Sequence, residues 1–150
     1  MKVYIGADHR GFLLKSKIKE IVQSLHFTLE DLGTNTDQES CDYPIISYKV
    51  AQHVAKDKNS RGILVCMSGI GQSIAANKVP GAYAALCYNS EAAELSRRHN
   101  NANILVLGAQ FVSPREVKKI VKVWLETKFE GGRHLRRFNQ IKMIEKRKRI

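Results

Sequence analysis

The chain alternates between short runs of apolar residues and segments whose apolar residues recur every three or four positions. The apolar runs, each five or six residues long, predict β-strands at residues 2–7, 27–32, 62–66, 82–87 and 102–107. The helical spacing predicts helices at residues 10–25, 43–57 and 90–99, and one that begins after Ser113. Strands that are apolar on both faces and separated by helices are typical of a parallel sheet covered on both sides. We therefore predict an α/β fold, with one three-layer domain around a five-stranded parallel sheet over residues 1–150.

Capping signals mark several of the predicted helix ends. Ser90 is expected to be the N-cap of the short helix, because serine side chains accept backbone N–H groups there. The segment Ser113-Pro-Arg-Glu116 is a capping box with proline at the first helical position. We expect Gly131-Gly132 to end that helix, and a basic helix to cover about residues 133–149.

The composition agrees with a globular domain and gives no sign of a membrane span. Apolar residues make up 43% of the chain and charged residues 26%, values typical of soluble proteins. No apolar run approaches the roughly 20 residues that a membrane helix needs. The N-terminus enters a predicted strand at once and lacks a signal-peptide pattern, so we expect a cytoplasmic protein.

The cysteine and histidine spacing predicts neither a disulfide framework nor a metal site. Cys41, Cys66 and Cys87 are odd in number and lack the CxxC spacing, and the five histidines lack the HExxH spacing. We expect the protein to hold no metal.

The positive charge is concentrated at the C-terminus. Residues 131–150 hold eight lysines and arginines against one acid, Glu145, and so carry +7 of the chain's net charge of +11. Such a tail binds nucleic acid or an acidic partner in some proteins. We do not expect nucleic-acid binding here, because Phe138 is the tail's only aromatic residue. A solvated helix end is the simpler interpretation.

The segment from Gly62 to Lys78 carries the strongest chemical signal. It is a buried strand, a glycine-rich turn with the sequence Cys66-Met-Ser-Gly-Ile-Gly71, and a helix start. Such a turn presents backbone N–H groups and a helix dipole to a bound anion, and a cysteine beside them ionises more easily than a free thiol. The segment therefore indicates a base or nucleophile for a small anionic substrate. A purely structural turn with a half-buried cysteine is the alternative.

Two familiar nucleotide motifs do not fit this turn. The Walker A spacing GxxxxGK[ST] is not present, and Ile74 stands where a dinucleotide fingerprint needs its third glycine. We therefore do not expect a nucleotide cofactor at the turn.

Other polar residues fall near the carboxyl ends of the predicted strands, where open α/β sheets bind ligands. Asp8 and His9 follow the first strand, and Asn89 and Ser90 follow the fourth. Asp8 also has a simpler role as a cap of the first helix. Arg133 and Arg137 share a helix face, which suits a phosphate or only a solvated surface.

Taken together, these segments resemble the ribose-5-phosphate isomerase B family, within the wider sugar-phosphate isomerases that include the galactose-6-phosphate isomerase subunits. The matching pieces occur in family order over nearly the whole chain. They are Gly6-Ala-Asp-His-Arg-Gly11, Asp42-Tyr-Pro44, Cys66-Met-Ser-Gly-Ile-Gly71, Ser73-Ile-Ala-Ala-Asn-Lys78, Leu95-Ser-Arg-Arg-His-Asn100 and Glu130-Gly-Gly-Arg-His134 with Arg137.

The resemblance implies a Rossmann-like domain that interconverts ribose 5-phosphate and ribulose 5-phosphate in the non-oxidative pentose phosphate pathway, without metal or organic cofactor. It implies that Cys66 takes the C2 proton and that His99 assists ring opening, with possible help from the Ser68 hydroxyl. It further implies a homodimer, or a dimer of dimers, with active sites at the subunit interface.

The resemblance also assigns the substrate-binding residues. Asp8 and Tyr43 would contact sugar hydroxyls or the ring oxygen. The phosphate would be held by His9, Arg133 and Arg137. The negative charge of the enediolate would be stabilised by Asn100 and by the backbone amides of Met67, Ser68, Gly69, Ile70 and Gly71.

The turn departs from the family's usual Cys-Gly-Thr-Gly at two positions. Ser68 keeps a hydroxyl in place of threonine, whereas Met67 puts a side chain where the family has glycine. A positive φ at Met67 would be strained, and the side chain would narrow the sugar pocket. Two alternatives therefore stay open: an isomerase for six-carbon phosphates such as allose or galactose 6-phosphate, and a sugar-phosphate-binding protein without turnover.

Overall fold

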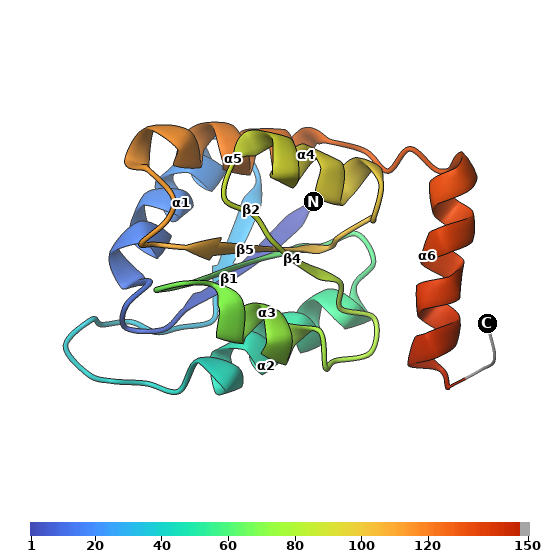
Figure 1. The fold of residues 1–150 in the computed structure, drawn as a ribbon. Helices are drawn as coiled ribbons and strands as arrows, with labels where there is room; N and C mark the ends of the chain where they lie inside the picture. The colour runs from blue at the N-terminus through green and yellow to red at the C-terminus, as the bar shows by residue number, and fades with distance from the viewer. Residues whose placement is uncertain (148–150) are drawn as a thin grey trace.

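A computed structural model describes residues 1–147 of the chain, and Figure 1 shows their fold. The strands are β1 (Lys2–Ala7), β2 (Thr28–Asp31), β3 (Arg61–Cys66), β4 (Ala84–Leu86) and β5 (Ile104–Gly108). The helices are α1 (Phe12–Ser24), α2 (Tyr43–Lys56), α3 (Ile70–Ala76), α4 (Ser90–Arg98), α5 (Pro114–Glu126) and α6 (Gly132–Glu145). All neighbouring strands are parallel, in the order β2-β1-β3-β5-β4. The predicted α/β class and five-stranded parallel sheet are confirmed.

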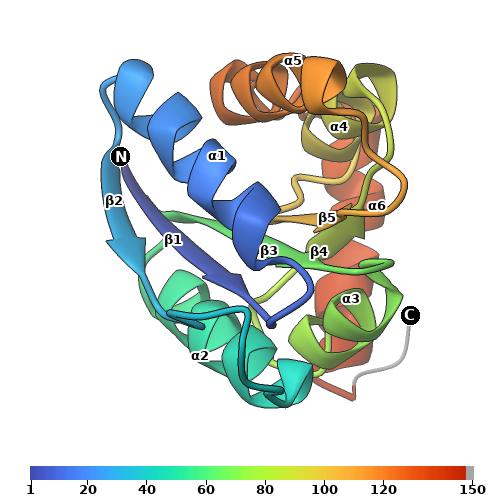
Figure 2. The same ribbon diagram turned by 90° about the vertical axis from the view of Figure 1, so that its left-hand side faces the viewer.

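Each face of the sheet packs against its own set of helices, as the two ribbon views show (Figures 1 and 2). Alternate strand residues such as Ile63 and Val65 join the core under α1, α4 and α5, in which Trp124 is fully buried. Their neighbours, such as Leu64 and Val106, join the core under α2 and α3. The strands are apolar on both faces because both faces are covered.

The last helix, α6, stands apart from both layers. Figure 1 shows it at the end of the sheet opposite to the strand tips. Phe138 is its main anchor: it is 4% exposed and meets the Tyr83 ring edge-on, with ring centroids 4.7 Å apart. Glu145 adds a second anchor, because its carboxylate accepts the Gly81 N–H over 2.7 Å. The basic helix is thus fastened to the amino edge of the sheet.

Three predicted helix ends differ from the structure. Asn89, not Ser90, is the N-cap of α4, because its side chain accepts the Ala92 N–H over 2.8 Å. Gly131 does not end α5, which stops at Glu126; with φ +73 it is instead the N-cap of α6. The basic helix ends at Glu145 rather than 149, and Arg147 has a left-handed φ of +54. Positions 148 and 149 lie outside the described residues.

Within residues 1–147, none of the helices has the length and apolar character needed to cross a membrane.

Candidate active site

The carboxyl end of β3 leads directly into the turn that carries Cys66. Cys66 is the last residue of the strand and is 5% exposed. The Gly69 N–H donates to the Cys66 Sγ over 3.0 Å, so the turn directs a backbone dipole at the sulfur. The Cys66 carbonyl accepts the Ala109 N–H over 2.8 Å, which ties the turn to the end of β5. The thiol is therefore fixed at the carboxyl edge of the sheet.

Two glycines allow this turn to pack closely. Gly69 has φ +83, and a Cβ there would lie 2.4 Å from Leu86 Cδ1. A Cβ on Gly108 would lie 2.5 Å from the Ser68 carbonyl oxygen. Since both positions exclude a side chain, the turn keeps the tight approach that brings the Gly69 amide to the sulfur.

Met67 fits the turn without backbone strain. Among residues 1–147, the non-glycine residues with positive φ are His26, Asn101 and Arg147, and Met67 is not one of them. The Met67 side chain is 40% exposed, and its Sδ accepts from the Arg10 Nη1 over 2.7 Å. Methionine therefore replaces the family's glycine here without backbone strain. Its effect on the site comes from the volume of its side chain, which lines the cavity.

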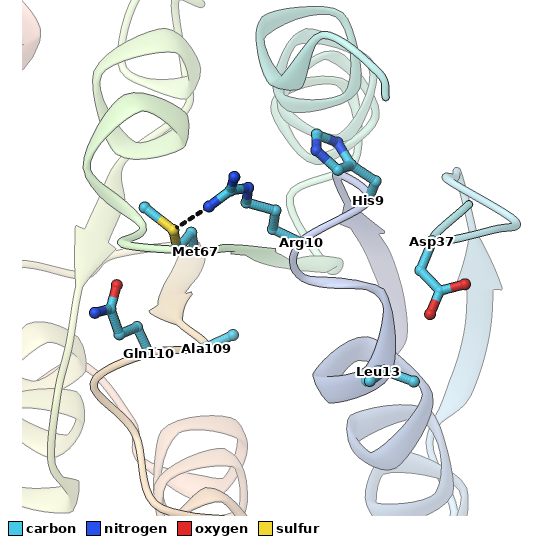
Figure 3. Close-up of a pocket in the computed structure, with 7 residues that line it drawn as sticks. All are labelled: His9, Arg10, Leu13, Asp37, Met67, Ala109 and Gln110. Carbon is cyan, nitrogen blue, oxygen red and sulfur yellow. Dashed lines mark hydrogen bonds between the residues drawn. The ribbon is translucent and has the colours of Figure 1, made fainter. Parts of the chain in front are cut away.

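A cavity of about 530 Å³ opens beside the turn, as Figure 3 shows. Its walls are formed by His9, Arg10, Leu13, Asp37, Met67, Ala109 and Gln110. In Figure 3 the Arg10 guanidinium lies between His9 and Met67, with Gln110 on the other side of the methionine. Because the Arg10 guanidinium donates to a neutral thioether rather than to a carboxylate, it can bind an anionic ligand without breaking an ion pair.

Asp8, His9 and Tyr43 lie at the same edge of the sheet. The Asp8 carboxylate is 7% exposed and accepts the Gly11 N–H over 2.9 Å, so it holds the turn that enters α1. His9 Nδ1 accepts the Cys41 N–H over 3.3 Å, which leaves its Nε2 to meet a ligand. The Tyr43 ring lies against Gly71, where a Cβ would come within 2.6 Å of Tyr43 Cζ.

The environment of Cys66 makes it harder to ionise, not easier. Burial raises the pKa of the thiol above its ordinary value, and the negative charge of Asp8 raises it further. The Gly69 N–H lowers it, but by less than burial raises it. The expectation of an easily ionised thiol is therefore wrong for the chain alone, because removing the sulfur from water outweighs the backbone hydrogen bonds from Gly69, Ser68 and Gln72.

The other predicted site residues form a second group at the amino edge of the sheet. His99 is the C-cap of α4, and Arg133 and Arg137 are exposed on the first turns of α6. A cavity of about 240 Å³ there is lined by His99, Asn100, His134, Arg137, Phe138 and Ile141. His134 is not among the site residues predicted from the sequence.

His134 links the members of this second group. Its ring is stacked on that of His99, and its Nε2 accepts from the Arg133 Nε over 3.4 Å. Burial lowers the pKa of His134, and the charges of His99 and Arg133 lower it further. An uncharged imidazole thus connects a phosphate-binding candidate to a ring-opening candidate.

The two groups lie at opposite edges of one sheet. Asn103 follows the His99–Asn100 loop and accepts the Gly62 N–H at the start of β3, whereas Cys66 ends that strand. A strand rises about 3.3 Å per residue, so Gly62 and Cys66 alone are about 13 Å apart. Figure 1 shows the same separation, with α6 at the far end from the strand tips. One chain therefore does not bring Cys66 and His99 to the same small substrate.

Among residues 1–147, one group of three side chains has the spacing of metal ligands. The ligand atoms of His99, Glu130 and His134 lie within 4.8 Å of one another. Two features weaken this group as a metal site. The His99 and His134 rings are parallel to within 4°, so their in-plane lone pairs do not meet at one point. Arg98 also donates to Glu130 over 3.3 Å and Arg133 lies beside His134, which makes the surroundings positive. The expectation of no metal stays a prediction.

Two residues in these groups escaped the sequence analysis. Arg10 belongs to the segment Gly6–Gly11, but only the fold shows that it shares a cavity with Met67. His134 lies four positions before Phe138, and this spacing places both side chains on the buried face of α6.

Comparison with known proteins agrees with this geometry. The family described as Ribose/Galactose Isomerase matches residues 3–141. The structure of Clostridium thermocellum ribose-5-phosphate isomerase B is 46% identical with a TM-score of 0.94, covering 98% of this chain and 99% of that one. The Mycoplasma genitalium ribose-5-phosphate isomerase B, solved with bound ribulose 5-phosphate, is 42% identical with a TM-score of 0.93, covering 97% and 96%. A D-erythrulose-4-phosphate isomerase from Pectobacterium atrosepticum is 38% identical over 88% of this chain and 87% of its own.

Fold and site together place the molecule among three-layer α/β proteins with a cysteine at the carboxyl edge of a parallel sheet. The chain belongs to the ribose/galactose isomerase family.

Proposed function

We propose that the chain is an aldose–ketose isomerase that interconverts ribose 5-phosphate and ribulose 5-phosphate, with Cys66 as the base. The observation that carries the proposal is the fixed Cys66 thiol, which accepts the Gly69 N–H beside a cavity that contains Arg10 and His9. The sugar phosphate in the Mycoplasma genitalium relative supports this choice of substrate.

The reaction needs only proton transfers. The Cys66 thiolate takes the proton from C2 of the open-chain aldose, and the electron pair moves through C1 to give an enediolate with its charge on O1. The protonated thiol then returns a proton to C1, while the O2 proton moves to O1 and leaves a ketone at C2. Backbone N–H donors on the developing oxyanion are worth roughly 3–4 kcal/mol each in comparable sites, a role we assign to the amides of residues 67–71.

The pKa of Cys66, which is raised in the single chain, has to fall for this role. A base is most effective when its pKa lies near the working pH, and cations beside the thiol would lower its pKa toward that range. Arg10 lies at this edge of the sheet but is not among the groups that shift the pKa of the thiol, so such cations have to come from a second copy of the chain. Ring opening of the cyclic sugar would use His99, with the Ser68 hydroxyl as a possible second proton donor.

A complete site then requires two copies of the chain. We propose that His99, Asn100, Arg133 and Arg137 of one subunit meet the Cys66 turn of its partner, in a homodimer with two equivalent sites. This arrangement is supported by the placement of the two groups at opposite edges of one sheet. The exposed apolar side chains Met67 and Ile70 border the Cys66 turn and suit such an interface.

Other sugar phosphates are the second candidate substrates. The family's description names galactose as well as ribose, and one relative is named for a four-carbon phosphate. Met67 favours the smaller sugars, because its side chain projects beside the cavity where the family has glycine.

The experiment that tests the proposal is formation of ribulose 5-phosphate from ribose 5-phosphate with EDTA present, for the wild type beside Cys66→Ala. We expect turnover in the wild type and none in the variant, with substrate binding nearly unchanged because the phosphate contacts remain. If a folded wild type turns over none of the four-, five- and six-carbon sugar phosphates, the remaining hypothesis is a sugar-phosphate-binding protein without catalysis.

A further inference from the structure

A second group of cations surrounds a cavity that the proposed reaction does not use. This cavity of about 280 Å³ lies between the start of β3, the loop before β5 and α6. Its lining includes Lys58, Arg61, Tyr83, Asn101, Phe138 and Lys142. Phe138 also lines the cavity with His99 and Arg137, so its ring lies between the two sites.

Arg61 has a buried donor without a partner. Its Nη1 donates to the Ser60 carbonyl over 2.8 Å, whereas its Nε is buried and makes no hydrogen bond within the described residues. Leaving a buried charged donor unsatisfied is costly, so such a group normally meets a ligand or a water.

Arg97 adds a second buried charge behind the cavity. It is 2% exposed, and its partners are the neutral oxygens of Asn101, Ala102 and Thr127. Burial lowers the pKa of Arg97 to about 10, and the charge of Arg61 contributes. Two arginines therefore lie close together in a poorly solvated place.

No carboxylate of residues 1–147 forms an ion pair with any of the four cations Lys58, Arg61, Arg97 and Lys142. The acid bonded to this part of the fold is Glu145, and its oxygens accept from the Gly81 N–H and the Tyr83 hydroxyl. Of these four, Arg97 is buried and Arg61 half-buried, and buried charges in proteins are normally paired, whereas Lys58 and Lys142 are exposed. The missing negative charge is thus expected from a ligand.

We infer that this cavity is a second anion site that binds phosphate, either free or as a small monoester, through Arg61 with Lys58 and Lys142. The guanidinium fork matches a tetrahedral oxyanion, and two flexible lysines at the mouth add charge. Asn101 Oδ1 accepts from Arg97, so its amide NH₂ is the group left to donate to the ligand. The cavity volume of about 280 Å³ suits a small ligand, because pockets for drug-sized ligands begin at about 300 Å³.

The test must separate this site from the proposed substrate site. Thermal unfolding of the full chain is followed with added orthophosphate against sodium chloride of equal ionic strength. We expect phosphate to raise the unfolding midpoint of an Arg133→Ala/Arg137→Ala variant, which lacks the proposed substrate-phosphate contacts. Adding Lys58→Ala and Lys142→Ala should weaken phosphate binding about tenfold, as the loss of two charge contacts implies.

Controls make the result specific. Lys17→Ala/Lys118→Ala removes the same charge from exposed positions of α1 and α5 and should leave the phosphate effect unchanged. Arg61→Met should lose phosphate binding yet be no less stable than the wild type in chloride, because it removes the unpartnered donor. A parallel titration with methyl phosphate shows whether the monoester or free phosphate binds more tightly.

The inference is overturned if phosphate and chloride act alike on the Arg133→Ala/Arg137→Ala variant. It is equally overturned if the two lysine substitutions leave the phosphate effect intact. Since activity is not the readout, either result is independent of the proposed isomerase reaction.

Discussion

The imidazole rings of His99 and His134 are stacked, with centroids 4.1 Å apart and planes within 4° of parallel. His134 is 6% exposed, whereas the His99 side chain is 33% exposed. The buried ring therefore acts as a platform that fixes the orientation of the accessible one. The Glu130 Oε2 atom lies 3.7 Å from His99 Nε2, so the carboxylate bounds the His99 ring on the side of that nitrogen.

His134→Ala should impair the proposed ring opening more than the proton transfer between carbons. An aromatic stack is worth about 0.5–1.5 kcal/mol, so we expect a loss of about two- to tenfold in kcat with the cyclic sugar. An open-chain substrate analogue should be processed at nearly the wild-type rate. His134→Phe should recover most of the loss, since it keeps a flat ring. Equal loss with both substrates, without recovery by phenylalanine, would show that His134 supports only the fold.

Subunit complementation tests whether each site takes residues from two chains. In a heterodimer with Cys66→Ala in one subunit and His99→Asn in the other, both lesions fall in one shared site and the second site is intact. We expect about half the wild-type activity, because one of two equivalent sites survives. Each homodimeric variant measured alone is the control. If every site belonged to a single chain, both sites of the heterodimer would be damaged and the activity would stay at the level of the controls.

The sequence predicted the sheet, because strands and the helices between them depend on local patterns, whereas the roles of the site residues stay predictions. The alternation of apolar runs and helical spacing placed both ends of all five strands within two residues of their positions in the structure. Helix ends were less certain, since Ser90 and Asn89 are equally good caps and only the backbone decides which one accepts the Ala92 N–H.

Spacing could not show that the two groups of candidate site residues lie at opposite edges of the sheet. Cys66 and His99 both belong to segments that match the family, yet the crossover through α4 returns His99 to the opposite edge of the sheet. The pKa of Cys66 was also out of reach, since it depends on burial and on Asp8, which is 58 positions away in sequence. The four cations Lys58, Arg61, Arg97 and Lys142 come from three separate segments and leave no linear motif.

Asp8→Asn should make Cys66 ionise at lower pH. The Asp8 charge raises the pKa of the thiol, so removing that charge lowers it, while the asparagine Oδ1 can still accept the Gly11 N–H. The rate of alkylation by iodoacetamide follows the thiolate fraction and can be read at the Cys66 peptide by mass spectrometry. We expect the midpoint of the rate–pH curve to move to lower pH in the variant. Asp37→Asn, which removes an exposed charge from the same cavity, should leave the midpoint in place. A midpoint unchanged by Asp8→Asn would remove Asp8 as an electrostatic neighbour of the thiol.

Met67→Gly should widen the choice of substrate. The Met67 side chain borders the cavity and contacts Arg10, and its removal both enlarges the cavity and releases the guanidinium. We expect kcat/KM for a six-carbon phosphate to rise relative to ribose 5-phosphate by about tenfold, within the 10–200-fold that a methylene-sized difference can give. Initial rates on ribose 5-phosphate and allose 6-phosphate measure this ratio. Met67→Leu keeps the bulk but removes the sulfur that accepts from Arg10, so it should retain the wild-type preference if size decides. A ratio that changes with leucine as much as with glycine would instead assign the preference to the Arg10–Met67 contact.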